Sequence, residues 1–186
     1  MQKAIFLDRD GTLNEDTGYV HRIEDWRWLP LVKESLAKAQ RAGFLLVVVS
    51  NQSGIARGLF TEEDLAVLER QIDCDLARSN VTVSWYHCPH LPEITGPCLC
   101  RKPAPGMLIT AQKDLTIDMA NSWMIGDRLR DCEAGIAAGL GTIKLSGTHE
   151  KSRSEDEKAK ELGSLVVQNL SQGIDCILTA QKECLA

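Results

Sequence analysis

Two aspartates near the start of the chain stand one residue apart, directly after an apolar run. The apolar residues Ala4–Leu7 lead into Asp8-Arg9-Asp10-Gly11-Thr12. Side chains at positions i and i+2 of an extended segment point to the same side, so Asp8 and Asp10 should face one way where the chain turns. Carboxylates this close repel each other unless a cation lies between them or one keeps a proton. The pair therefore predicts metal binding and acid–base chemistry, although Asp and Gly are also common in turns after strands.

Later residues would complete a site for a phosphoryl group and its metal. Asp127 follows another short apolar segment and would add a third carboxylate, a set of oxygens that suits Mg²⁺. Asp131 lies one helical turn further on and would orient a metal-bound water. The Ser50 hydroxyl and the Lys102 ammonium would complement a bound phosphate. Each residue alone also fits an ordinary strand end or a solvated surface, but together they predict phosphoryl chemistry.

A second group of residues has the spacing of metal ligands. Cys88-Pro89-His90 is followed by Cys98-Leu99-Cys100. Three thiolates and one imidazole suit tetrahedral zinc, and four protein ligands leave no open position, which indicates a structural ion. His87 is a competing imidazole outside this pattern, and a loop with incidental cysteines is the alternative. A zinc-binding loop at about 87–101 would fix the approach of the chain to Lys102.

Strands and helices are predicted to alternate along the chain, which indicates an α/β fold with a mainly parallel sheet covered on both sides. Ligands of such sheets bind beyond the carboxyl ends of the strands, where Asp8, Ser50 and Asp127 are all expected. Thr61 with Asp64 predicts the start of a helix. The predicted strands are the opening segment and residues 44–49, 81–86, 123–125, 142–145 and 165–168. The predicted helices begin near 31 and cover 61–78, 105–115, 130–138 and 170–180, with 150–160 a solvated helix or loop.

Length, charge and composition restrict the class of protein. A chain of 186 residues suits a single domain, 1–186. A formal charge of −5 argues against nucleic acid as a partner. The apolar run Phe44–Val49 is too short to span a membrane, and the start of the chain has no secretory apolar region, so a cytoplasmic protein is expected. Seven cysteines, an odd number, then favour free or metal-bound thiols over disulfides.

These motifs resemble, in their order, the four motifs of the haloacid dehalogenase (HAD)-like phosphatases. The matching residues are Asp8-Arg9-Asp10-Gly11-Thr12, Ser50, Lys102, and Gly126-Asp127 with Asp131. The resemblance implies a three-layer α/β/α, Rossmann-like HAD fold. The segment between the second strand and Lys102 is too short for a large cap domain.

The resemblance also implies a role for each residue of the motifs. Asp8 would be the nucleophile that forms an aspartyl-phosphate, and Asp10 the general acid and base. Ser50 and Lys102 would stabilise the phosphoryl group. Mg²⁺ would be held by Asp8, Asp127 and the backbone carbonyl of Asp10.

Within this superfamily, the chain resembles the D-glycero-D-manno-heptose 1,7-bisphosphate 7-phosphatases. The resemblance lies in Asp16–His21, the run Asn51–Gly58, the Cys/His quartet and Cys100–Met107. It implies an enzyme whose partner is a small sugar bisphosphate, which loses its C7 phosphate during synthesis of nucleotide-activated heptose for lipopolysaccharide or another surface glycan. A monomer is expected. The expected substrate contacts are Asp16, Thr17, Gly18, Tyr19, Asn51, Gln52, Ser53, Arg101 and Arg128.

Three other functions compete with this interpretation. Histidinol-phosphatases share the aspartate motif and a similar zinc loop, but typically have Asn-Gln-Asp-Gly where this chain has Asn51–Gly54. A zinc-stabilised binding protein without catalysis would not need the retained Asp8, Lys102 and Asp127. A nucleic-acid end phosphatase is disfavoured by the acidic balance of the chain.

Overall fold

The structure, a computed structural model, describes residues 1–147 and 150–184. Its strands form a six-stranded sheet in the order β3-β2-β1-β4-β5-β6, and every neighbouring pair is parallel. The predicted parallel α/β fold is therefore confirmed. The strands are β1 (Ala4–Leu7), β2 (Leu45–Asn51), β3 (Ser84–Cys88), β4 (Trp123–Gly126), β5 (Gly141–Leu145) and β6 (Leu165–Val167).

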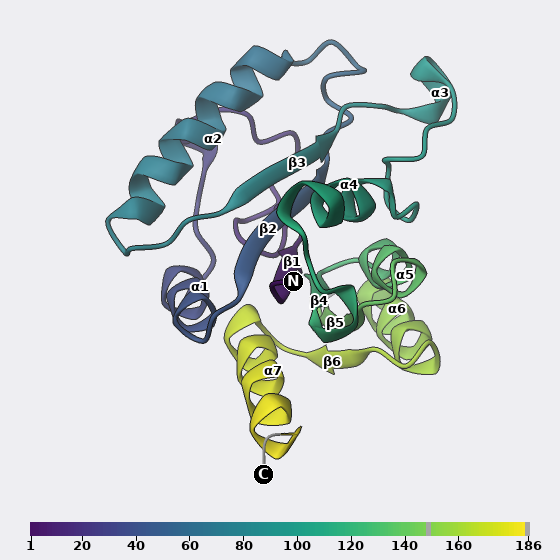
Figure 1. Ribbon diagram of the computed structural model, residues 1–186. Helices are drawn as coiled ribbons and strands as arrows, with labels where there is room; N and C mark the ends of the chain where they lie inside the picture. The colour runs from purple at the N-terminus through teal and green to yellow at the C-terminus, as the bar shows by residue number, and fades with distance from the viewer. Residues whose placement is uncertain (148–149, 185–186) are drawn as a thin grey trace.

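Helices cover both faces of the sheet (Figure 1). In β1, Ile5 and Leu7 pack into one apolar cluster while Ala4 and Phe6 pack into the other, and all four are fully buried. Such burial on both faces is what a central strand of a parallel sheet requires. One face is covered by α1 (Val32–Arg41), α2 (Glu62–Ala77) and α7 (Leu170–Cys184), and the other by α4 (Gly106–Leu115) and α5 (Leu129–Ala137). The remaining elements are α3 (Pro92–Thr95), α6 (Glu150–Glu161), η1 (Ile23–Asp25) and η2 (Met119–Asn121).

The start of α2 follows its sequence signature. The Thr61 hydroxyl accepts a hydrogen bond from the backbone N–H of Asp64 at 3.1 Å, and the Asp64 carboxylate accepts one from the Thr61 N–H at 2.9 Å. This reciprocal cap satisfies two N–H groups that the helix itself leaves unpaired. The predicted apolar stripe is buried in full: Leu65, Leu68, Ile72 and Leu76.

The predicted boundaries of β3 are wrong, because strand pairing decides where the strand begins and ends. β3 was expected at 81–86 but covers Ser84–Cys88, because it is these residues that pair with Val47–Asn51 of β2. Cys88 therefore ends a strand and does not lie in the irregular loop. Within that loop, the chain forms the short helix α3.

Between β2 and Lys102 the chain forms only α2, β3 and α3, so no large cap domain is inserted there. None of the helices in the described residues is long and apolar enough to cross a membrane.

Candidate active site

The residues of the four motifs meet at the carboxyl edge of the sheet. Asp8 follows β1, Ser50 lies near the end of β2, and Asp127 follows β4. The strand order places β1 between β2 and β4, so these three ends are adjacent. Lys102 reaches the same place from the segment that follows β3, and Asp131 from the first turns of α5.

Lys102 is buried and contacts the carboxylates of Asp8 and Asp131. Its Nζ atom lies 2.8 Å from Asp8 Oδ1 and 2.7 Å from Asp131 Oδ1, and it donates to the carbonyl of Val49 at 2.7 Å. Burial by itself would lower the pKa of Lys102, but the charges of Asp131 and Asp8 raise the pKa above its ordinary value. The ammonium donates hydrogen bonds to Asp8 and to the Val49 carbonyl and forms an ion pair with Asp131, so its charge is already shared between two carboxylates.

Three carboxylates form a cluster with the geometry of a cation site. Oxygen atoms of Asp8, Asp127 and Asp131 all lie within 4.8 Å of one another. Burial, with the charges of Asp8 and Asp131, raises the pKa of Asp127 to about 7. Its buried Oδ1 atom has no hydrogen-bond partner among the described residues. A hard divalent cation would relieve this repulsion and give Oδ1 a partner, so these oxygen donors fit Mg²⁺.

Two glycines of the motifs make room for these carboxylates. A Cβ atom on Gly11 would lie 2.5 Å from Asp127 Oδ2, and Gly11 also has a φ of +80° that favours glycine. A Cβ atom on Gly126 would lie 2.4 Å from Asp131 Oδ2. Both positions therefore require the smallest residue because a carboxylate occupies the space.

The Asp10 side chain has its own set of partners. Arg9 donates to both of its oxygens at 3.0 Å, Asn14 donates to Oδ1 at 3.0 Å, and Gln52 donates to Oδ2 at 3.1 Å. Asp8 and Asp10 were expected to face one way, but only the Asp8 side chain belongs to the acidic cluster.

Sequence reasoning missed the roles of Arg9 and Asn14, which hold Asp10. The Arg9 side chain is 1% exposed and also donates to the Val20 carbonyl at 2.7 Å. The position of Arg9 between Asp8 and Asp10 was the available signal, because an arginine beside two carboxylates can form an ion pair with one of them. Arg9 thus connects Asp10 to the segment that follows the predicted substrate loop 16–19.

Two predicted substrate contacts, Asn51 and Gln52, bind other residues of the site. The Asn51 amide donates to the backbone carbonyl of Lys102 and accepts from its N–H, both at 3.0 Å. Gln52 Nε2 donates to Ser50 Oγ at 2.6 Å as well as to Asp10. In this structure both amides therefore bind residues that the sequence predicts to be catalytic. Ser53, the third residue of this run, is half-buried.

The predicted substrate loop Asp16–Tyr19 is exposed and faces Arg128. Gly18 and Tyr19 have positive φ angles of 84° and 51°, which turn the loop sharply. Arg128 Nη2 lies 3.4 Å from Asp16 Oδ2, and its Nε lies 3.0 Å from Asp127 Oδ2. The charge of Asp127 raises the pKa of Arg128 further above its ordinary value. A hollow of about 300 Å³ is lined by Asp16, Arg128, Arg130 and Glu155.

A larger cavity of about 620 Å³ lies beside Asp127 and Arg128. Thr12, the start of α1 and the segments after β5 and β6 complete its wall. Sequence reasoning missed this cavity, because most of its lining residues belong to no motif and lie far apart in the chain.

The four predicted zinc ligands converge at the end of β3. Their ligand atoms lie within 4.8 Å of one another, with Cys88 Sγ 3.0 Å from Cys100 Sγ and 3.7 Å from Cys98 Sγ. The ring atom His90 Nδ1 lies 3.2 Å from Cys100 Sγ. The competing imidazole of His87 instead lies 3.7 Å from Glu69. Three sulfur atoms and one nitrogen at such distances fit tetrahedral zinc.

Burial, together with the hydrogen bond that it shares with Cys100, raises the pKa of the Cys88 thiol above its ordinary value. Zinc would release that proton on binding, because the thiolate is the ligand. Arg101 Nη1 donates to the His90 carbonyl at 3.1 Å, so the residue directly before Lys102 is bound to this cluster. A Cβ atom on Gly106 would lie 2.2 Å from the Leu99 carbonyl oxygen, so α4 begins directly against the same loop.

Comparisons with known proteins agree with this site. The chain is 46% identical over 165 residues to the D-glycero-beta-D-manno-heptose-1,7-bisphosphate 7-phosphatase of Photorhabdus laumondii, covering 86% of this chain and 88% of that protein. It is 45% identical over 177 residues to the protein of the same name from Escherichia coli K12, covering 92% and 93%. This chain belongs to the heptose-1,7-bisphosphate 7-phosphatase family.

Structural comparison supports the same family. The crystal structure of the D,D-heptose 1,7-bisphosphate phosphatase from B. bronchiseptica, complexed with magnesium and phosphate, matches with a TM-score of 0.85 and 31% identity. The match covers 96% of this chain and 99% of that one. The HAD-hydrolase-like family model matches residues 99–173. The predicted HAD fold and phosphoric monoester hydrolase class are thus confirmed for this member of the heptose-bisphosphate phosphatase family.

Proposed function

We propose that this protein removes the C7 phosphate of D-glycero-β-D-manno-heptose 1,7-bisphosphate and leaves the C1 phosphate in place. The names of relatives 46% and 45% identical over most of the chain support the substrate and its anomer. The observation that carries the chemistry is the contact of Lys102 with Asp8 and Asp131 at the edge of the sheet, beside Asp127. The product would serve the synthesis of nucleotide-activated heptose for a surface glycan.

The reaction would proceed in two displacements. A carboxylate oxygen of Asp8 attacks phosphorus, the bond from phosphorus to the C7 oxygen breaks, and protonated Asp10 gives its proton to that oxygen. Water then attacks the aspartyl-phosphate, Asp10 takes the proton of that water, and inorganic phosphate leaves with Asp8 restored. Gln52 Nε2 donates to both Asp10 and Ser50 and would keep the Asp10 carboxyl group close to the Ser50 hydroxyl during both displacements.

Mg²⁺ would be held by Asp8, Asp127 and the backbone carbonyl of Asp10. Asp131 would not bind the ion directly but would orient a water molecule bound to it. The bound ion would neutralise charge on the phosphoryl oxygens as the nucleophile approaches. Lys102 would add a second positive charge on the same side, and the Ser50 hydroxyl would donate to a phosphoryl oxygen. The magnesium and phosphate in the B. bronchiseptica structure support this arrangement.

The rest of the sugar bisphosphate would lie among Asp16–Tyr19, Ser53, Arg101 and Arg128. A second phosphate needs cations away from the reacting one, and the two arginines are suitable donors. Zinc bound by the Cys/His quartet would be structural and would keep Arg101 and Lys102 in position. The protein would work as a single-domain monomer in the cytoplasm.

The test is Mg²⁺-dependent release of phosphate from a panel of substrates. The panel contains both anomers of the heptose 1,7-bisphosphate, fructose 1,6-bisphosphate and histidinol phosphate. The β anomer should have the highest kcat/KM, and Asp8→Asn should abolish release while the protein stays folded. Preference for histidinol phosphate would contradict the heptose assignment, and a folded wild-type protein inert towards a wide phosphate panel would contradict the enzymatic one.

A further inference from the structure

Helix α6 is the most polar helix of the fold, yet it lies against the segment that carries Asp127. It packs beside α5 and β6 at the edge of the sheet (Figure 1). Among its described side chains, only Asp156 and Ala159 are buried. So little apolar surface is a weak reason for a helix to dock. Polar contacts must therefore account for its position.

The first contact passes through Lys144 of β5, whose side chain is fully buried. Its Nζ atom donates to the backbone carbonyl of Asp127 at 2.9 Å and to that of Leu145 at 3.0 Å. The same atom lies 3.0 Å from Asp156 Oδ1 of α6. The other oxygen of Asp156 accepts a hydrogen bond from the Ser146 hydroxyl. One ammonium group thus joins α6 to the residue that carries the proposed metal ligand.

The second contact comes from the neighbouring residue of α6. Glu155 Oε2 accepts a hydrogen bond from the backbone N–H of Leu129 at 3.1 Å. Leu129 is the first residue of α5, and a carboxylate is favourable at the positive end of a helix. The segment 127–129 is therefore held at both ends by α6, through Lys144 at one end and directly at the other.

We propose that Lys144, Asp156 and Glu155 are positioning residues that hold the Asp127 carboxylate in place for Mg²⁺. This inference rests on the proposed magnesium-dependent activity. The charges of Asp8 and Asp131 repel the Asp127 carboxylate. Contacts from outside the three-carboxylate cluster are therefore needed to fix the position of the segment that carries Asp127. Loss of residues that orient a metal ligand typically weakens metal affinity by about 10- to 100-fold.

The experiment measures Mg²⁺ binding in the presence of inorganic phosphate by titration calorimetry, alongside activity and thermal unfolding. Lys144→Met alone would leave the buried Asp156 carboxylate unpaired and risk unfolding. The double variant Lys144→Met/Asp156→Leu removes both charges while the Asp127 carbonyl still loses its donor. We expect it to fold and to bind Mg²⁺ about tenfold more weakly, with a higher Mg²⁺ requirement for activity and an unchanged KM for the sugar.

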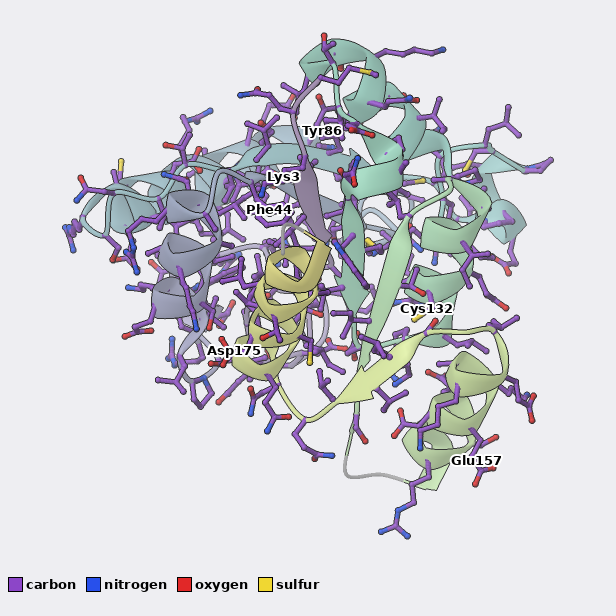
Figure 2. The ribbon with its side chains drawn as sticks, turned by 60° about the horizontal axis from the view of Figure 1, so that its bottom comes forward. Lys3, Phe44, Tyr86, Cys132, Glu157 and Asp175 are labelled. Carbon is purple, nitrogen blue, oxygen red and sulfur yellow. The ribbon has the colours of Figure 1, made fainter. Side chains whose placement is uncertain are left out.

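Two single variants sharpen the result. Glu155→Gln keeps the buried ion pair between Lys144 and Asp156 intact and should also raise the Kd for Mg²⁺. If the double variant does not fold, this single variant tests the proposal. Glu157→Gln is the matched control, because Glu157 is exposed on the outer side of the same helix (Figure 2) and has no partner among the described residues. Its Kd for Mg²⁺ should equal that of the wild type.

A folded double variant, or a folded Glu155→Gln variant, with the wild-type Kd for Mg²⁺ would overturn the proposal. Loss of thermal stability without a change in Mg²⁺ binding would also overturn it, since the contacts would then be structural only. A wild type that binds Mg²⁺ but does not hydrolyse the heptose bisphosphate would contradict only the proposed function. A wild type that binds no Mg²⁺ would contradict both.

Discussion

Replacing Asn51 by alanine would remove both hydrogen bonds that hold the backbone of Lys102. The side-chain amide donates to the Lys102 carbonyl and accepts from its N–H, each at 3.0 Å. These bonds fix the segment after the zinc loop to the end of β2. They also set the position from which the Lys102 side chain reaches Asp8.

The size of the effect follows from these two bonds. At about 1 kcal/mol each, their loss should destabilise the protein by about 2 kcal/mol. For a protein of this size, that loss corresponds to a decrease in Tm of about 4–8 °C. A small displacement of Lys102 near the reacting atoms should lower kcat by about 10- to 100-fold. KM should change little, because the Asn51 amide is engaged within the protein.

The assay combines thermal unfolding with steady-state kinetics on the heptose bisphosphate. Asn121→Ala is the control, because Asn121 makes only a local, exposed side-chain hydrogen bond to Asp118. Its Tm and kinetic constants should stay close to those of the wild type. A large rise in KM for Asn51→Ala, with Tm and kcat unchanged, would refute this reasoning and return Asn51 to the substrate contacts.

Three further predictions concern the metals and the glycines of the site. In the metal-free protein the pKa of Asp127 is raised from 3.8 to about 7. The protonated carboxyl group therefore stabilises the folded protein at low pH, and this stabilisation is lost as the pH rises through the folded-state pKa. Mg²⁺ should therefore raise Tm more at pH 8 than at pH 6, and equal increases would contradict this. The purified protein should contain about one zinc ion per chain. Cys98→Ser should lower the zinc content measured by mass spectrometry whereas Cys74→Ser should not, and loss in both variants would argue against the assigned cluster. Gly126→Ala should lower Tm, because its Cβ would lie 2.4 Å from a neighbouring carboxylate oxygen. Gly173→Ala has ordinary contacts at 3.6 Å and should raise Tm through better helix propensity.

The sequence by itself determined the type of fold and the chemistry of its site. Apolar periodicity and helix caps are local, so the alternation of strands and helices could be predicted from neighbouring residues. Because the carboxyl ends of parallel strands form one edge, the positions of Asp8, Ser50 and Asp127 after three strands already indicated a common site. The Cys/His quartet could be proposed from spacing alone, since metal ligands require particular residue types.

Only the tertiary structure decided which partner each polar side chain has. Asn51 and Gln52 were predicted to contact substrate, and the structure shows in addition that their amides bind Lys102, Asp10 and Ser50. The region 150–160 was predicted to be a solvated helix or loop because it is so rich in charge. Its Asp156 nevertheless forms a buried ion pair with Lys144 beside the Asp127 carbonyl. Composition reports how polar a segment is, whereas burial and pairing depend on what packs against it, and that is set by contacts between residues far apart in the chain.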